Sequence, residues 1–466
     1  MRLWGGRFEG KTDDLMKRLN DSFRFDQRLY AADIQGSIAY AEALLGVRLL
    51  TSQEYNSIVQ GLKDVLAEFE DGRFEPLPSD EDIHTAVERR LTELIRPTAG
   101  KLHTGRSRKD QVALDLRLWL MDQIDVIREM VADVQTAIVE KAEAHLDLIM
   151  PGYTHMQPAQ PVLFSHWLMN IFWMLERDQD RLADCRRRTA ICPLGSGALA
   201  GNPFGIDRVA LADALGMAAI SQNSIDAVSD RDFAAEFLFA AALIGTHLSR
   251  FAEDLILFSG PAYRFVTLGE QYTTGSSLMP QKRNPDALEL ARSKSGRLLG
   301  DLVSLMMTLK GLPSSYNKDL QEDKEPLFDS VDTLETLLPV IAGIIKSIEP
   351  NRKAMNGALD ISMLATDLAD YLVRQGMPFR EAHGVVGRLV RQAEDRGVGL
   401  DQLSLDEMRA GSILFDVDVA AVFDFAESVE RRNVAGGTAT EAVRVQIAQA
   451  RECLAAKSVR DSAVIS

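Results

Sequence analysis

The segment 275–285, with the sequence GSSLMPQKRNP, combines small hydroxyl side chains, a lysine and a helix-start signal. Asn284 suits the N-cap of a helix, and the proline and aspartate that follow it suit the first turn. Backbone N–H groups and the dipole at such a helix start favour an anion. We therefore expect a loop that binds a carboxylate and stabilises negative charge developing on it, through Ser276, Ser277 and Lys282.

Three further segments, at residues 101–110, 151–158 and 316–324, gather basic and small polar residues at breaks in the helical pattern. Each has a plainer interpretation when taken alone, such as a structural role for His155 or surface ion pairs for Lys324. Their joint occurrence in a chain with a net charge of −16 favours a cationic pocket for a small polycarboxylate.

The overall composition is that of an ordinary globular protein, with 46% hydrophobic and 26% charged residues. The acidic balance argues against nucleic acid or an anionic membrane as the main partner. The three cysteines are odd in number and widely scattered, which indicates free thiols in a reducing compartment. The longest apolar runs, 237–244 and 337–345, are far shorter than a membrane span. The sequence therefore predicts a cytoplasmic protein.

The elements that would position these segments are long helices. Residues 110–150 contain neither glycine nor proline, and their apolar residues recur at helical spacing, which predicts one helix of about 40 residues. The pattern predicts no strand and favours an all-α fold built around a long bundle. Helices that are apolar over a wide arc indicate an oligomer. The further long helices expected are 161–191, 231–259, 286–310 and 327–348, and the domains expected are 1–108, 109–359 and 360–466.

The segment 275–285 resembles the signature Gly-Ser-Ser-x-Met-Pro-x-Lys-x-Asn-Pro of the fumarase and aspartase superfamily. Within that superfamily, the chain is similar to the argininosuccinate lyases along nearly its whole length. The segments that carry this resemblance are LWGGRF at 3–8, DIH at 82–84, HTGRSR at 103–108, GYTH at 152–155 and NKDLQEDK at 317–324.

The resemblance implies a three-domain helical homotetramer with a twenty-helix core, in which each active site is assembled from three subunits. It implies reversible cleavage of argininosuccinate to arginine and fumarate, without a metal or an organic cofactor. By position, Ser276 is the catalytic serine, His155 its partner histidine, and Lys282 lies at the carboxylate end of the site. The substrate-binding positions that the resemblance implies are Ser22, His84, Arg108, Lys109, Thr154, Ser277, Asn284, Tyr316, Gln321 and Lys324.

One position departs from the family, which usually has asparagine where this chain has Lys109. The lysine adds charge and length and removes an acceptor. An alternative is therefore a related carbon–nitrogen lyase that acts on another N-substituted aspartate. A catalytically silent structural protein on the same scaffold is disfavoured because Ser276, His155 and Lys282 are all retained. A helical interaction scaffold is disfavoured because it leaves the cationic loops unexplained.

Overall fold

The computed structural model describes residues 12–464, with side chains up to residue 456, so the LWGGRF segment at 3–8 lies outside the described residues. The chain divides into two compact units. Unit 1 contains the described residues up to Glu129, together with Asp178–Gly245 and Lys294–Glu335. Unit 2 contains Met130–Arg177, Thr246–Ser293 and the described residues from Thr336 onward.

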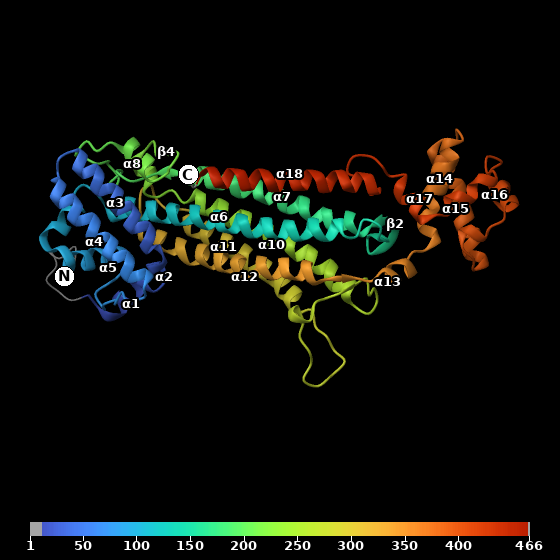
Figure 1. Cartoon of the computed structure of the whole chain (residues 1–466), viewed down its shortest axis with the longest axis horizontal. Coiled ribbons are helices and arrows are strands. Elements are labelled where there is room, and N and C mark those ends of the chain that lie inside the picture. Colours follow the sequence, from blue (N-terminus) through green and yellow to red (C-terminus); the bar gives the residue numbers. More distant parts are fainter. Residues whose placement is uncertain (1–11, 465–466) are drawn as a thin grey trace. The chain divides into compact units, whose positions relative to one another are not determined.

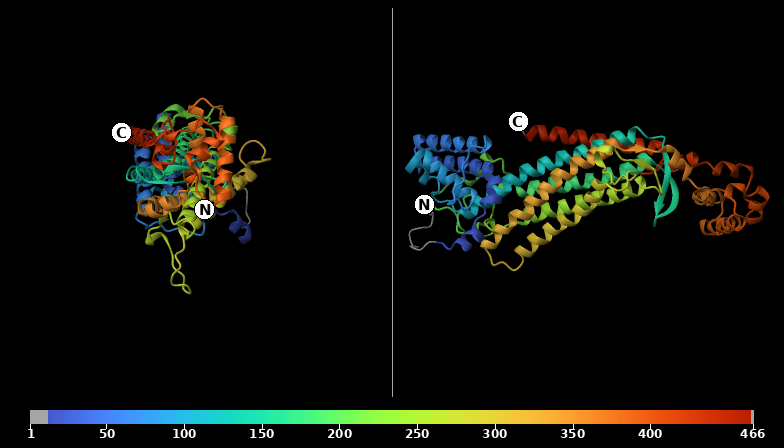
Figure 2. Two further views of the ribbon diagram at one scale, coloured as in Figure 1. Left: turned by 90° about the vertical axis from the view of Figure 1, so that its right-hand side faces the viewer. Right: turned by 90° about the horizontal axis from the view of Figure 1, so that it is seen from below.

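Long helices dominate both units, as the sequence predicts (Figure 1; Figure 2). The first of them ends at Glu143, earlier than expected, because the chain turns there and enters a strand at Ile149. All residues from Gln111 to Leu120 are buried, which places this part of the helix at the centre of unit 1. The long helices are α6 (Arg108–Glu143), α7 (Phe164–Thr189), α10 (Asp232–Ser259), α11 (Asp286–Leu309) and α12 (Lys324–Ser347).

These helices pack closely against one another within unit 1. Gly245 of α10 faces α11 so closely that an added Cβ would lie 2.7 Å from the Leu298 side chain. The Ser330 hydroxyl of α12 donates to the Asp301 carboxylate of α11 at 2.7 Å. The contacts are those of a helical bundle.

The shorter helices precede α6, lie between α7 and α10, or follow α12 in the sequence. Residues 368–422 contribute to a hydrophobic core near the C-terminal end, with Leu372 and Phe415 completely buried. The three-domain division at 108/109 and 359/360 stays a prediction. The shorter helices are α1 (Asp14–Asn20), α2 (Phe23–Asp26), α3 (Tyr30–Gly46), α4 (Ser52–Glu70), α5 (Ile83–Ile95), α8 (Arg208–Ala214), α9 (Ser224–Ala227), α13 (Arg352–Gly357), α14 (Ala365–Arg374), α15 (Phe379–Arg396), α16 (Leu405–Gly411) and α17 (Phe425–Glu430), followed by the longer α18 (Thr440–Val464).

The prediction that the chain has no strand is wrong at residues 149–163. Strands β1 (Ile149–Thr154) and β2 (Gln157–Leu163) form an antiparallel hairpin, with a register shift between Pro151 and Tyr153. The prolines and the glycine in this segment hide the strand pattern, because such residues are usual only at sheet edges and bulges. The remaining strands of the described chain are two-residue pairs, β3 (Ile191–Cys192) with β4 (Ala219–Ile220) and β5 (Val266–Thr267) with β6 (Glu349–Pro350).

Across the residues that the structure describes, no helix combines the length and the apolar character that crossing a membrane requires.

Candidate active site

The predicted site residues fall into two groups, one in each compact unit. We call them the unit 1 group and the unit 2 group, and each is described by itself. The unit 1 group consists of Ser22, His84, Arg108, Lys109, Tyr316, Gln321 and Lys324. The unit 2 group consists of Thr154, His155, Ser276, Ser277, Lys282 and Asn284.

Ser22 is held in place by the buried carboxylate of Asp26. The Ser22 hydroxyl donates to Asp26 Oδ2 at 2.6 Å, and Asp26 Oδ1 accepts the backbone N–H of Ile83 at 3.0 Å. Burial raises the pKa of Asp26 to about 6, although the hydrogen bond from Ser22 and the charge of Lys324 act in the opposite direction. Asp26 therefore ties Ser22 to the start of α5 and lies near Lys324.

His84 and Arg108 share a second carboxylate, that of Asp82. Asp82 is the N-cap of α5, and its Oδ2 lies 3.7 Å from His84 Nδ1 and 3.6 Å from Arg108 Nε. On its other side, His84 Nε2 lies 2.7 Å from Asp115 Oδ2, and the imidazole is only 1% exposed. The contact with Asp115 and the burial of the ring therefore orient His84, and Nδ1 lies near Asp82 without a hydrogen bond.

The buried carboxylates around His84 raise the question of a metal site. One donor atom from each of Asp33, His84 and Asp115 lies within 4.8 Å of the others. Gln111 already donates to Asp33, and burial raises the pKa of Asp115 well above its ordinary value. Protonation of a carboxyl weakens it as a metal ligand, so we interpret this cluster as a hydrogen-bonded support for His84.

Lys324, the first residue of α12, is buried rather than at the surface. Its Nζ lies 2.7 Å from Asp323 Oδ1, and the other oxygen of Asp323 accepts a hydrogen bond from Arg231 Nε at 2.5 Å. The plainer interpretation of Lys324 as a member of surface ion pairs is therefore wrong. Sequence analysis missed Arg231 as a site residue, because it is the first residue of the predicted helix 231–259 and carries no motif of its own.

Lys109 contacts another residue of the unit 1 group. Its Nζ lies 5.6 Å from the centre of the Tyr316 ring, within the range of a cation–π interaction. Burial and the nearby Asp323 raise the pKa of the Tyr316 hydroxyl. Gln321, from the same segment as Tyr316, donates to the Asn20 carbonyl at 3.1 Å and so links this segment to the residues before Ser22.

In the unit 2 group, Ser276 lies in a long loop between α10 and α11, drawn in yellow tones in Figure 1. Its Oγ accepts the backbone N–H groups of Leu278 at 3.3 Å and Met279 at 3.0 Å. Two N–H donors directed at one hydroxyl oxygen stabilise negative charge on that oxygen. Ser277 and Lys282 are exposed, and their place beside the positive end of α11 stays a prediction.

The base of this loop differs from the prediction. Backbone hydrogen bonds of 3.1 and 2.8 Å join Thr274 and Asn284. The Asn284 side-chain amide donates to the Thr274 hydroxyl at 3.4 Å and to the Gly275 carbonyl at 3.3 Å. α11 begins only at Asp286, so the predicted N-cap role of Asn284 is wrong. Asn284 closes the loop because its amide finds partners across the loop base.

Thr154 and His155 lie at the exposed tip of the β1–β2 hairpin. Thr154 pairs with Gln157, so His155 and Met156 form a two-residue turn, with φ of 53° and 60°. Such a turn favours asparagine and glycine, and other residues adopt positive φ at a cost of about 1–3 kcal/mol. Strain of this kind is found most often at functional sites.

The two parts of the unit 2 group are not bonded to each other. Among the described side chains, no hydrogen bond or ion pair joins the hairpin tip to the loop that carries Ser276. Both segments are directed toward solvent rather than toward a shared buried pocket.

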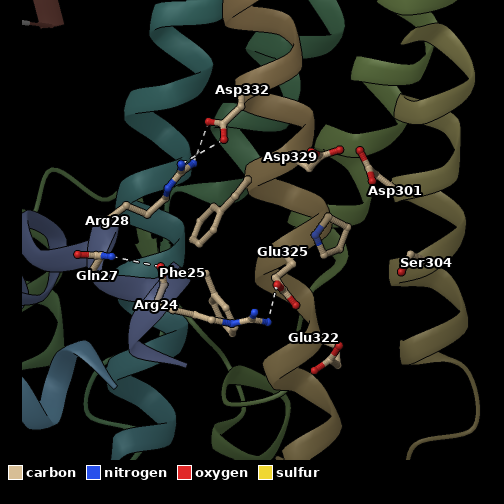
Figure 3. Close-up of a pocket in the computed structure, with 12 residues that line it drawn as sticks. Arg24, Phe25, Gln27, Arg28, Asp301, Ser304, Glu322, Glu325, Asp329 and Asp332 are labelled. Atoms are coloured by element: carbon tan, nitrogen blue, oxygen red, sulfur yellow. Dashed lines mark hydrogen bonds and ion pairs between the residues drawn. The ribbon is translucent and has the colours of Figure 1, made fainter. Parts of the chain in front are cut away.

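A cavity of about 750 Å³ in unit 1 is lined by residues other than the predicted ones. Figure 3 shows that Arg24 and Arg28 reach toward Glu325 and Asp332, while Asp301 and Asp329 face each other. Carboxylates outnumber the guanidinium groups in its lining, so the cavity does not suit a polycarboxylate.

Comparisons with known proteins agree with the fold. A family model described as "Lyase" matches residues 6–300, and one described as "Argininosuccinate lyase C-terminal" matches residues 362–430. An argininosuccinate lyase of Roseiflexus sp. (strain RS-1) is 59% identical over 452 residues, or 97% of this chain and 99% of that protein. One of Herpetosiphon aurantiacus is 55% identical over 453 residues, or 97% of this chain and 100% of that protein.

Among solved structures, an EDDS lyase in complex with formate matches with a TM-score of 0.85 and 29% identity. The match covers 98% of this chain and 93% of that one. This likeness confirms the predicted fold class.

Proposed function

The chain belongs to the argininosuccinate lyase family, and we propose that it catalyses the reversible elimination of fumarate from argininosuccinate, which leaves arginine. The match to relatives of that name along nearly the whole chain carries the proposal. The geometry around two residues supports it. Backbone N–H groups donate to Ser276 Oγ and would stabilise an alkoxide there, and Lys324 is a buried cation.

The reaction breaks the bond between the amine nitrogen and a carbon of the succinyl half. Ser276, as an alkoxide, takes the proton from the carbon beside a carboxylate. Each unit by which the pKa of a hydroxyl is lowered requires about 1.4 kcal/mol of preferential stabilisation. The N–H groups of Leu278 and Met279 supply part of it, because they donate directly to Ser276 Oγ.

Loss of this proton produces a doubly charged aci-carboxylate, which is the main barrier. Lys282 and Asn284 would bind this carboxylate, and a positive charge placed where negative charge develops is often the largest catalytic contribution. His155 protonates the leaving nitrogen, or positions the water that does so. The electron pair of the broken carbon–nitrogen bond leaves with the nitrogen, and fumarate remains.

The active site of the proposal is shared between subunits. The exposed tip at His155 and the exposed loop at Lys282 are then completed by residues of other copies of the chain. The second half of α11 supports an oligomer, since Leu299, Val303 and Met306 are each more than half exposed at helical spacing. We assign a homotetramer in the cytoplasm, and light scattering of the purified protein tests the subunit number.

A second candidate function is elimination from another N-substituted aspartate, and Lys109 is the residue that favours it. The lysine contacts Tyr316, a predicted substrate-binding residue, and so bears on which amine is accepted. The two functions predict the same chemistry at Ser276 and different amine products.

A single set of assays tests both functions. The purified chain is given argininosuccinate, and release of fumarate is followed by its ultraviolet absorbance and arginine by chromatography. In the reverse direction, fumarate is offered with arginine or with a series of other amines. The proposal expects the highest kcat/KM with argininosuccinate and arginine; a clear preference for a different amine would favour the second function.

A further inference from the structure

We propose that Arg231 is a positioning residue, which acts through Asp323 to hold the Lys324 ammonium where it binds an anionic group of the substrate. This inference rests on the proposed function, since Lys324 is a substrate-binding residue only within it.

The three side chains form one buried chain of contacts. Arg231 Nε donates to Asp323 Oδ2 at 2.5 Å, and Lys324 Nζ donates to Asp323 Oδ1 at 2.7 Å. Arg231 is 1%, Asp323 0% and Lys324 4% exposed. One oxygen of Asp323 accepts from Arg231 and the other from Lys324. Removal of the arginine would therefore free the carboxylate to move and would shift the lysine bonded to it.

Arg231 is fixed independently of Asp323. Its Nη1 donates to the Asp230 carbonyl at 2.8 Å, immediately before α10 begins. Burial acts to raise the pKa of Asp323, but the charges of Lys324 and Arg231 and their hydrogen bonds hold it below its ordinary value. Asp323 therefore stays ionised and keeps both cations in place.

The two cations of the cluster keep N–H groups that Asp323 does not occupy. Two cations flank one carboxylate, and Arg231 Nη2 is buried without a hydrogen-bond partner among the described residues. Lys324 has three N–H donors, and Asp323 accepts one of them. Buried N–H groups that lack an acceptor are satisfied when an anion binds there, which the carboxylates of the substrate provide.

The chain offers a matched control in Arg117, an arginine of unit 1 that is also buried. It is 3% exposed, donates to the Thr189 carbonyl at 3.0 Å, and pairs with the side chain of Asp230. Its guanidinium lies 4.1 Å from the centre of the Phe233 ring. Arg117 thus shares the burial and the neighbourhood of Arg231, but its recorded bonds do not involve Asp323.

The experiment is a double-mutant cycle on the full-length enzyme, with KM and kcat measured for argininosuccinate. Arg231→Met and Lys324→Met are made singly and together, with Arg231→Lys as the conservative variant and Arg117→Met as the control. Melting temperature and subunit number are measured for every variant.

We expect Arg231→Met to raise KM by about tenfold or more, with a smaller change in kcat. In the Lys324→Met background the same change should alter KM by no more than about twofold, because the lysine it positions is gone. Arg231→Lys should restore part of the loss in KM. Arg117→Met should lower the melting temperature and leave KM close to that of the wild type.

Two results overturn the inference: KM effects of Arg231→Met and Lys324→Met that simply multiply, or an Arg231→Met variant that loses thermal stability while its KM stays unchanged. If Arg231→Met does not fold, Asp323→Asn enters the cycle in its place, because asparagine has nearly the size of aspartate but lacks the negative charge that links Arg231 to Lys324. Absence of argininosuccinate turnover in the wild type would count against the proposed function itself, and is read separately from the cycle.

Discussion

Ser22, His84 and Lys324 in unit 1 are buried and bonded to carboxylates, whereas Ser276 and His155 in unit 2 lie in a loop and a turn that reach solvent. The unit 1 side chains are therefore held in one geometry by the folded chain itself. The unit 2 side chains depend on local turns, with Ser276 oriented by two backbone N–H groups and His155 by a strained hairpin tip.

We propose from this difference that the unit 1 group serves binding and the unit 2 group serves proton transfer. Binding requires charges that are already placed, because ordering them during binding reduces affinity. Proton transfer requires groups that approach the substrate after it is bound, and such groups are commonly carried by loops. The substitutions below test whether the two groups separate into binding and chemistry in this way.

The largest effect is expected for Ser276→Ala. Loss of the proton acceptor should lower kcat by about a thousandfold or more, while KM changes little, because the unit 1 group still binds substrate. Steady-state kinetics with argininosuccinate measure both constants. Ser277→Ala is the control, since it removes the neighbouring hydroxyl, and should cost about tenfold or less. Substantial turnover in Ser276→Ala would remove this residue from the chemistry.

The hairpin tip allows the turn to be separated from the imidazole. Asparagine tolerates positive φ, so His155→Asn should keep the hairpin and lower kcat by about 10²–10³-fold. Met156→Gly should relieve strain, raise the free energy of unfolding by about 1 kcal/mol and keep kcat near the wild-type value. Kinetics and thermal melting of both variants check this. A fall in kcat for Met156→Gly as large as for His155→Asn would show that the turn itself matters.

A third test concerns the buried carboxylate that holds Ser22. Because the pKa of Asp26 is raised to about 6 on folding, the native state binds its proton more tightly than the unfolded chain does. The free energy of unfolding should therefore fall as pH rises from about 4 to about 6, by roughly 3 kcal/mol at most from this one group. Asp26→Asn lacks this titration, so its stability relative to the wild type should rise over that interval and stay level above it.

Urea unfolding at a series of pH values measures that difference. Asp147→Asn is a control of opposite sign, because a hydrogen bond from Arg352 lowers the pKa of the exposed Asp147. A stability difference for Asp26→Asn that does not vary with pH would show that this carboxyl is not perturbed by burial.

The sequence predicts the helical part of this fold well, and the reason is local. Helical periodicity depends on neighbours in the sequence, so the helix expected at 231–259 is found as Asp232–Ser259. The hairpin at 149–163 escapes prediction because its prolines and glycine occupy edge and bulge positions, which depend on the partner strand.

The same limit applies to the candidate site. The motif around Ser276 is contiguous and can be read directly, whereas Arg231 and Asp323 are 92 residues apart and meet only in the folded bundle. Asn284 looks like an N-cap in sequence, yet its amide bonds across the loop base, a competition that short polar side chains commonly enter.

The smallest effect is expected at Lys109, where the unit 1 group departs from its family. The ammonium beside the Tyr316 ring contributes about 0.5–2 kcal/mol at such a contact, so its loss should change binding severalfold and leave chemistry nearly untouched. We expect Lys109→Asn to raise KM for argininosuccinate by about threefold to tenfold with kcat within about twofold, measured in steady state. Lys109→Met, which keeps the stem and removes the charge, should behave in the same way if charge is the cause.

A rise in KM for Lys109→Met alone would mean that asparagine replaces the lysine through its own hydrogen bonds. Wild-type kinetics in both variants would show that the lysine is incidental, and the departure would then carry no information about the amine that this site accepts.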